Sequence, residues 1–119
     1  MGLSETLLRL VDHGDEEALI LMGRCVSINH WHLKNGQGDA FVDHWTALLK
    51  WTRTQDGFES ARLVADEADA HHFVSVGECG DSTARQAWSD EPRYLELGMP
   101  CVELCDDMQS REYEVKAAF

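Results

Sequence analysis

Positive charge is scarce in this chain. Lysine and arginine together number 10 against 22 aspartates and glutamates, so the formal net charge is -12 over 119 residues. Nucleic acid or an anionic membrane surface would repel such a chain, and no basic patch offsets the repulsion. We therefore expect no nucleic-acid and no membrane partner, and we expect the chain to bind a small-molecule substrate and copies of itself.

Long apolar runs are missing as well. The best run, residues 18–22, is the length of a strand and far too short to span a bilayer. Residues 1–5 carry no basic cluster ahead of an apolar core, so we expect no signal peptide and a cytoplasmic location. With two prolines and 44% hydrophobic residues, the composition argues against disorder and predicts one domain with a real core.

The four cysteines form no C-x-x-C motif, and a zinc site needs tighter clustering than they show. We interpret Cys25, Cys79, Cys101 and Cys105 as small buried side chains in a reducing compartment. Cys101 and Cys105 are four residues apart, which on a helix would place them on one face. No metal is expected.

Hydrophobic periodicity predicts four strands and two helical regions. Strands are expected over 18–32, 58–65, 71–76 and 109–117. The first helical region is 40–54, capped by Asp39. The second consists of a helix that begins after a cap at Asp81 or Ser82 and a further helical segment from Pro92, with 101–105 as a separate turn or helix. Residues 1–17 read as an N-terminal arm or short helix, and 18–119 as a single domain.

That order of elements is the ferredoxin-like βαββαβ arrangement, an α+β fold with an antiparallel sheet and its helices on one face. The opposite face of the sheet then needs a cover. Dimerisation through this face would supply it, so we expect a homodimer.

Over roughly residues 18–115 the chain resembles the antibiotic biosynthesis monooxygenase family of dimeric α+β barrel proteins. The resemblance is carried by the strand and turn 28–36, the helical Phe41 and Trp45, the turn at Gly57 and Phe58 with Ala61, Arg62 and Leu63, the strand 73–77, the helix start at Asp81 and Ser82, and Trp88 and Pro92. Order and spacing together, rather than any single motif, make the match.

The resemblance implies which reactions the chain could catalyse and which residues would take part. Some members oxidise polyketide aromatics with O₂ without flavin, metal or haem, using the deprotonated substrate as reductant, and related members degrade haem. Asn29 matches the strand asparagine that holds a substrate oxygen. Cys79 stands where haem-degrading members have a Trp, and the helix after Trp88 offers Tyr94 and Leu95 but no His. We therefore expect no cofactor.

Such an oxygenase needs a proton acceptor and a donor to an oxyanion. Asn29 is the expected donor, and His72 or His32 the expected base, because histidine titrates near neutral pH. On an alternating strand only one of His71 and His72 can face a pocket. His30, His32, His44, His71 and His72 are the candidates, and surface histidines are the alternative interpretation. The expected substrate-binding residues are Trp31, Trp45, Phe73, Cys79, Trp88 and Tyr94, with core or dimer packing as the alternative for the tryptophans.

Three functional hypotheses follow. The first is a cofactor-independent monooxygenase that oxidises an aromatic or polyketide-like small molecule with O₂. The second is a non-catalytic dimeric ligand-binding or accessory protein, and the third is a polyketide cyclase. A cavity reached by Asn29 and one histidine would favour catalysis, whereas a cavity filled by Trp31, Trp45 and Phe73 would favour the accessory role.

Overall fold

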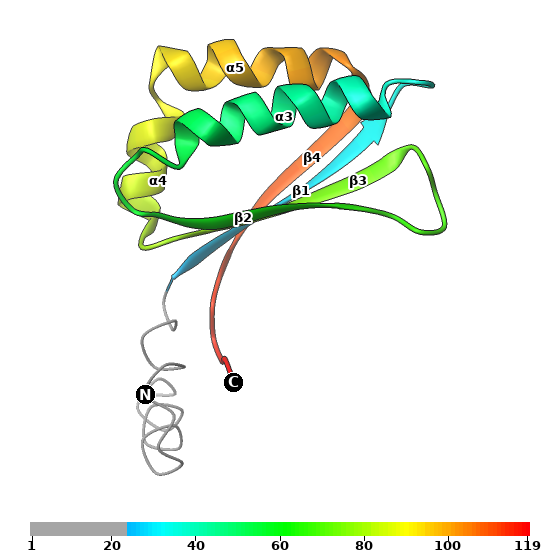
Figure 1. Cartoon of the computed structure of the whole chain (residues 1–119). Coiled ribbons are helices and arrows are strands. Elements are labelled where there is room, and N and C mark those ends of the chain that lie inside the picture. The colour runs from blue at the N-terminus through cyan, green and yellow to red at the C-terminus, as the bar shows by residue number, and fades with distance from the viewer. Residues whose placement is uncertain (1–23) are drawn as a thin grey trace.

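The structure, a computed structural model, describes residues 24–119 and consists of one sheet with helices on a single face (Figure 1). The strands are β1 (Cys25–Leu33), β2 (Phe58–Ala65), β3 (His72–Cys79) and β4 (Cys105–Glu114), and the helices are α3 (Gly38–Thr52), α4 (Ser82–Ser89) and α5 (Pro92–Glu103). Every neighbouring pair is antiparallel in the order β2-β3-β1-β4. This confirms the predicted ferredoxin-like α+β fold.

Local chemistry sets the helix starts. The Asp81 carboxylate accepts a hydrogen bond from the backbone N of Ala84 at 2.7 Å, which caps α4 as the sequence predicted. Pro92 begins α5, where its missing N–H costs nothing. For α3 the predicted cap was wrong. Gln37 is the capping residue, because Gly38 is already helical, and Asp39 lies in the first turn, where its charge suits the helix dipole.

The predicted N-terminal elements fall partly outside the described residues. The arm over 1–17 and the first part of the predicted strand over 18–32 lie there, and the described part of that strand is β1.

The C-terminal boundaries differ from those predicted. Helix α5 continues through Pro100 to Glu103, so 101–105 is not a separate element, and β4 begins at Cys105 instead of residue 109. Cys101 and Cys105 therefore do not share a helix face. Burial raises the pKa of the fully buried Cys101 thiol to about 11, so it is an inert core side chain.

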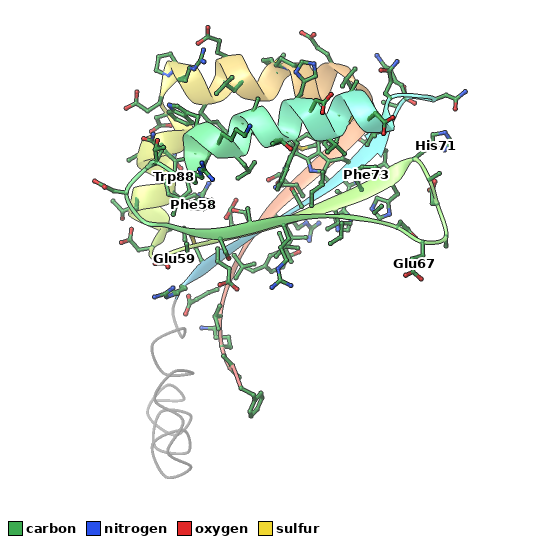
Figure 2. The ribbon with its side chains drawn as sticks, in the orientation of Figure 1. Phe58, Glu59, Glu67, His71, Phe73 and Trp88 are labelled. Carbon is green, nitrogen blue, oxygen red and sulfur yellow. A yellow bond between two sulfur atoms is a disulfide. The ribbon has the colours of Figure 1, made fainter. Side chains whose placement is uncertain are left out.

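The core lies between the sheet and the helices. Phe41 is 0% exposed and its ring centroid lies 5.1 Å from that of Trp31 and 5.8 Å from that of Phe73. A second buried cluster joins Trp88 to Cys25 and Cys79. Figure 2 shows Phe58 and Phe73 turned from the sheet toward the helices, and Trp88 of α4 next to Phe58.

Cys25 and Cys79 form a disulfide, which corrects the interpretation of all four cysteines as unpaired. The two residues are direct partners at the ends of β1 and β3, with Cα atoms 5.3 Å apart. Strand register, which spacing along the chain does not reveal, brings them together across 54 positions of sequence.

The opposite face of the sheet carries no helix of the described chain (Figure 1). Side chains alternate along β1, so Val26, Ile28, His30 and His32 point to this uncovered face. None of the helices in residues 24–119 combines the length and the hydropathy needed to cross a membrane.

Candidate functional site

A cavity of about 390 Å³ separates the sheet from the helices. The strands contribute most of its polar side chains, and the helices contribute Arg85 and most of its large apolar side chains. The strands contribute, among others, Ser27, Asn29, Trp31, Ser75, Gly77, Cys79, Ser110 and Glu112, and the helices contribute Trp45, Leu48, Leu49, Arg85, Trp88, Tyr94, Leu95 and Met99. A largely apolar lining with a few polar groups is typical of a site for a small organic ligand.

Ser75 is the centre of the floor. Asn29 Nδ2 donates to Ser75 Oγ at 3.0 Å, and the indole Nε1 of Trp31 donates to the same oxygen at 2.9 Å. Asn29 and Ser75 are direct partners across β1 and β3. Trp31 follows two residues later on the same face. Strand pairing therefore fixes all three side chains.

The hydrogen bonds of Ser75 leave its own O–H free. A hydroxyl oxygen has two lone pairs and one hydrogen, and both lone pairs of Ser75 Oγ are engaged by donors. Within residues 24–119 its own O–H has no acceptor, although Ser75 is 4% exposed and lines the cavity. Two incoming hydrogen bonds also polarise the hydroxyl and strengthen it as a donor. This O–H is therefore available to donate a hydrogen bond into the cavity.

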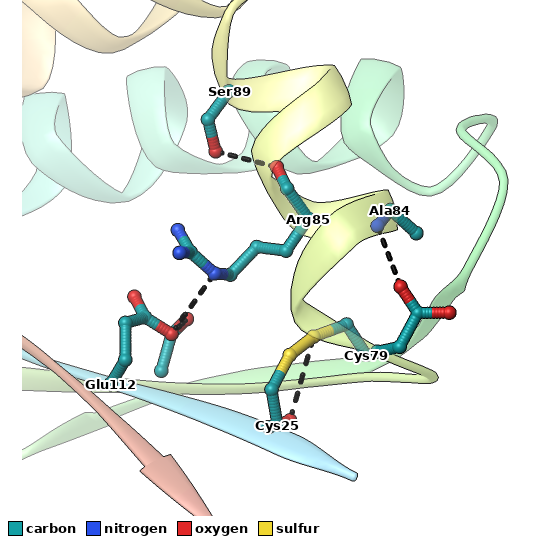
Figure 3. The surroundings of a disulfide bond; sticks show 8 residues. Cys25, Cys79, Ala84, Arg85, Ser89 and Glu112 are labelled. Atoms are coloured by element: carbon teal, nitrogen blue, oxygen red, sulfur yellow. Dashed lines mark hydrogen bonds and ion pairs between the residues drawn. A yellow bond between two sulfur atoms is a disulfide. The ribbon is translucent and has the colours of Figure 1, made fainter.

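The other polar end of the cavity is an ion pair. Arg85 of α4 places Nε 3.2 Å from Oε2 of Glu112 of β4 (Figure 3). The Ser27 hydroxyl donates to the same Oε2 at 2.6 Å. Neighbouring Tyr94 has a raised pKa, because burial and then the Glu112 charge disfavour its phenolate. Tyr94 therefore stays a neutral phenol.

Most of the predicted ligand-contacting residues lie around this cavity. Asn29, Trp31, Trp45, Cys79, Trp88 and Tyr94 all line it. Phe73 does not. It packs on the core cluster around Phe41 and lines a separate, shallower groove beside β2. Trp31 and Trp45 leave the cavity open rather than filling it.

The histidines lie elsewhere. His72 and His32 do not line the cavity; they stack on the uncovered face with ring centroids 4.8 Å apart. His72 Nδ1 lies 2.8 Å from Asp66 Oδ2, and His72 Nε2 lies 2.9 Å from His30 Nδ1. His71 is exposed at the hairpin turn (Figure 2). Strand alternation thus separates both expected bases from Asn29.

The Asp66 to His72 contact orders the hairpin loop. This hydrogen bond is the main cause that lowers the pKa of the Asp66 carboxyl, with a further contribution from the backbone N–H of Ala68. Residues 24–119 contain no group of three or more His, Cys, Asp or Glu side chains arranged to hold a metal ion.

Sequence reasoning missed Ser75, Arg85 and Glu112 as site residues. Ser75 carried a signal, since it is a polar residue inside the otherwise apolar run 73–76, just as Asn29 is in its own strand. Arg85 and Glu112 carried none. Their meeting depends on how α4 crosses over β4, which no local pattern encodes.

Comparison with known proteins points to one family. The family model described as antibiotic biosynthesis monooxygenase matches residues 25–97, more than half of the chain. The chain is similar to the crystal structure of SnoaB, a cofactor-independent oxygenase from Streptomyces nogalater, with a TM-score of 0.73, 14% identity, and coverage of 79% of this chain and 94% of that one. It is also similar to a conserved protein from Methanosarcina mazei Go1, with a TM-score of 0.76, 13% identity, and coverage of 82% and 98%.

At these identities the structural matches show the fold alone. No curated protein matches the sequence.

Proposed function

Because the chain belongs to the antibiotic biosynthesis monooxygenase family, we propose that it oxidises an aromatic or polyketide-like small molecule with O₂ in this cavity, without flavin, metal or haem. The observation that carries the proposal is the Ser75 hydroxyl, held by Asn29 and Trp31 and left with a free O–H at the cavity floor. SnoaB, which has the same fold, is described as a cofactor-independent oxygenase.

The cavity suits a flat, electron-rich substrate. Trp45, Trp88 and Leu49 offer an apolar roof for its rings, and the polar floor faces its oxygens. The substrate contributes the electrons itself once it is deprotonated. The required task of the protein is therefore to hold an anion, which a buried and oriented hydroxyl does well.

The reaction balances as follows for an anthrone-type substrate. Loss of one proton from the ring methylene gives an enolate whose charge lies on the oxygen bound by Ser75. The enolate carbon donates electrons to O₂ and forms a C–O bond, giving a peroxide after protonation. The O–O bond then breaks as the second methylene hydrogen leaves as a proton, so that one oxygen atom becomes a ketone and the other leaves as water.

The proton acceptor in this account is solvent water. No histidine of residues 24–119 lines the cavity, so the bases expected from the sequence, His72 and His32, are not part of the proposal. Water reaches the polar end of the cavity, where the Arg85 and Glu112 side chains are 22% and 38% exposed. Ring delocalisation and the Ser75 hydrogen bond both stabilise the enolate, so a weak base suffices.

One observation favours a second candidate. No histidine of the described residues lines the cavity, which would suit a non-catalytic protein that binds the same class of ligand. The two candidates differ in oxygen consumption, not in binding.

The chain is further proposed to form a homodimer through the uncovered face. This face presents Ile28, Val74 and Val76, together with Val64, which is 48% exposed. Sedimentation velocity should show a dimer that V74E converts to a monomer. V42E, at an exposed position of α3, should stay dimeric. A wild-type monomer would contradict this part of the proposal.

The oxidation itself is tested by oxygen uptake. The metal-stripped protein is incubated with a panel of anthrones and hydroquinones and compared with Asn29→Ala and with Ser82→Ala, an exposed serine outside the cavity. Uptake that depends on the protein, falls in the first variant and persists in the second supports the proposal. Saturable binding of these compounds with no uptake would instead establish the ligand-binding alternative.

A further inference from the structure

The Cys25–Cys79 disulfide lies at the wall of the cavity. Cys79 lines the cavity, whereas Cys25, its direct partner across β1 and β3, does not. Both cysteines pack with the buried Trp88, and Phe58 and Tyr94 pack against this cluster. Figure 3 shows the bond beside the first turn of α4. A pair of sulfur atoms that can exchange two electrons therefore adjoins a space lined by aromatic rings.

The two sulfur atoms differ in what can reach them. Cys25 is 6% and Cys79 is 2% exposed to solvent, so neither is open at the surface of the protein. Of the two, only Cys79 lines the cavity, so a bound ligand meets Cys79 first. Dithiol redox pairs use this asymmetry: one thiol attacks an external group, and the second displaces that group by forming the disulfide.

We infer that the reduced Cys25–Cys79 pair transfers two electrons to a quinone bound in the cavity and thereby becomes the disulfide. The inference rests on the proposed function in one respect, since the same cavity must bind the aromatic ring. A quinone is neutral, so the net charge of -12 does not repel it. The rings of Phe58, Trp88 and Tyr94, which line the cavity, offer apolar and stacking contacts to its flat face.

Electrons and protons balance between the pair and the quinone. The Cys79 thiolate adds to a ring carbon next to a quinone carbonyl, which forms a C–S bond and an enolate. The Cys25 thiolate then attacks the Cys79 sulfur, so that the S–S bond forms and the C–S bond breaks. The electron pair of the C–S bond passes into the ring, which takes up the two protons that the thiols released and becomes the hydroquinone. A small external thiol reduces the disulfide again.

The other two cysteines lack the position and the reactivity for this step. Neither Cys101 nor Cys105 lines the cavity. Burial raises the pKa of Cys101 to about 11, and the pKa of Cys105 is also raised, mainly by burial. Both therefore stay protonated near neutral pH, whereas the nucleophile in such reactions is the thiolate. They serve as internal controls in the same chain.

The test follows quinone reduction by the reduced protein in the absence of O₂. The protein is reduced with dithiothreitol, separated from it under argon, and mixed with 1,4-naphthoquinone, which has ring carbons open to addition. About one hydroquinone should form per chain, and the number of thiols should fall from four to two. A sample without quinone should keep all four thiols. Peptide mapping of the oxidised wild type should find the new disulfide between Cys25 and Cys79.

Matched variants separate the two steps. Cys25→Ser cannot release the adduct, so Cys79 should carry a covalently attached ring that mass spectrometry locates. Cys79→Ser should form no hydroquinone above the protein-free reaction, and Cys101→Ser should behave as the wild type does. An unreactive anthraquinone carboxamide, whose quinone carbons are closed to addition, should quench the tryptophans that line the cavity, leave the dithiol reduced and slow the reduction of naphthoquinone.

The outcomes distinguish this inference from the proposed function. Four thiols remaining in the wild type, or equal hydroquinone yields from the wild type and Cys79→Ser, would overturn the inference. Adducts or disulfides mapped to Cys101 or Cys105 in the wild type would do the same, and this measurement needs no variant to fold. If the carboxamide still binds in these cases, the aromatic cavity stands, whereas its failure to bind would contradict the proposed function as well.

Discussion

The side-chain amide of Asn29 and the hydroxyl of Ser75 lie 3.0 Å apart across directly paired positions of β1 and β3. Because the pair belongs to the centre of the sheet, its geometry is set by backbone hydrogen bonds rather than by flexible loops. Trp31 adds a second donor to the same oxygen. In the proposed reaction, groups held this firmly would need little rearrangement when charge develops on the substrate.

Replacing Ser75 with alanine should cost the most activity of any floor substitution. Loss of one hydrogen-bond donor to an oxyanion lowers kcat by about 10²- to 10³-fold in well-studied enzymes. Trp31→Phe removes one of the two donors to Ser75 and should cause a smaller loss. Steady-state oxygen uptake, with kcat and KM measured separately, checks both variants.

A loss of activity caused by misfolding of the Ser75→Ala protein would also lower its stability and its ligand binding. The Ser75→Ala protein should retain its thermal unfolding midpoint within a few degrees and should still bind the unreactive anthraquinone carboxamide. If the variant turns over within about twofold of the wild type, Ser75 is not the oxyanion donor.

Acid should weaken the hairpin loop through Asp66. The folded-state pKa of this carboxyl lies below its ordinary value of 3.8, so the stabilisation is present above pH 3.8 and is lost as the pH falls through the lowered value. Carbon-detected NMR titration should place the pKa of Asp66 lower in the wild type than in His72→Phe. The shift should be reversed only in part, because the Ala68 N–H still donates to this carboxylate. Identical titration curves would show that His72 has no such influence.

The Cys25–Cys79 disulfide should stabilise the fold substantially. It closes a long loop, with a sequence separation of 54, and bridges of this kind typically contribute about 2–4 kcal/mol. Reduction, or the double change to serine, should lower the free energy of unfolding by about that amount in urea titrations. Thiol counting on the unreduced native protein checks the premise: two free thiols, Cys101 and Cys105, are expected, and four would contradict it.

Gly57 should tolerate no side chain. Its φ is +83°, and a Cβ built there would lie 2.5 Å from the Cβ of Ala84 at the start of α4. Gly36 is the matched control, because its φ of +75° is similar but a Cβ there would meet nothing within 4 Å. Both alanine variants bear the backbone cost, about 1 kcal/mol or more. Only Gly57→Ala should also shift α4, giving the larger drop in thermal midpoint; equal drops would show that the contact with Ala84 does not matter.

The fold could be predicted because its signals are local. Alternation along 58–65, the Asp81 cap and the Gly57 turn each fix an element, and their order leaves few topologies. The end of α5 was harder, because Pro100 resembles a break although it lies inside the helix. The Asp39 cap failed for a similar reason, since the Gly38 before it is already helical.

The site depended on relationships that sequence does not encode. Asn29 was identifiable because a lone amide in an apolar strand needs a partner, but that partner, Ser75, follows only from the register of β1 and β3. The histidines drew attention by their chemistry, yet alternation places His32 and His72 on the uncovered face. Arg85 and Glu112 meet only once α4 is placed over β4.

The most direct test of the account is the fate of isotopically labelled O₂. An anthrone is turned over by the wild-type protein under the labelled gas, and the product is analysed by mass spectrometry after subtraction of the protein-free reaction. The account predicts one labelled oxygen atom in each molecule of product and the other in water, with formation slowed in Ser75→Ala. Product oxygen drawn from unlabelled water, or labelling no faster than without protein, would contradict it.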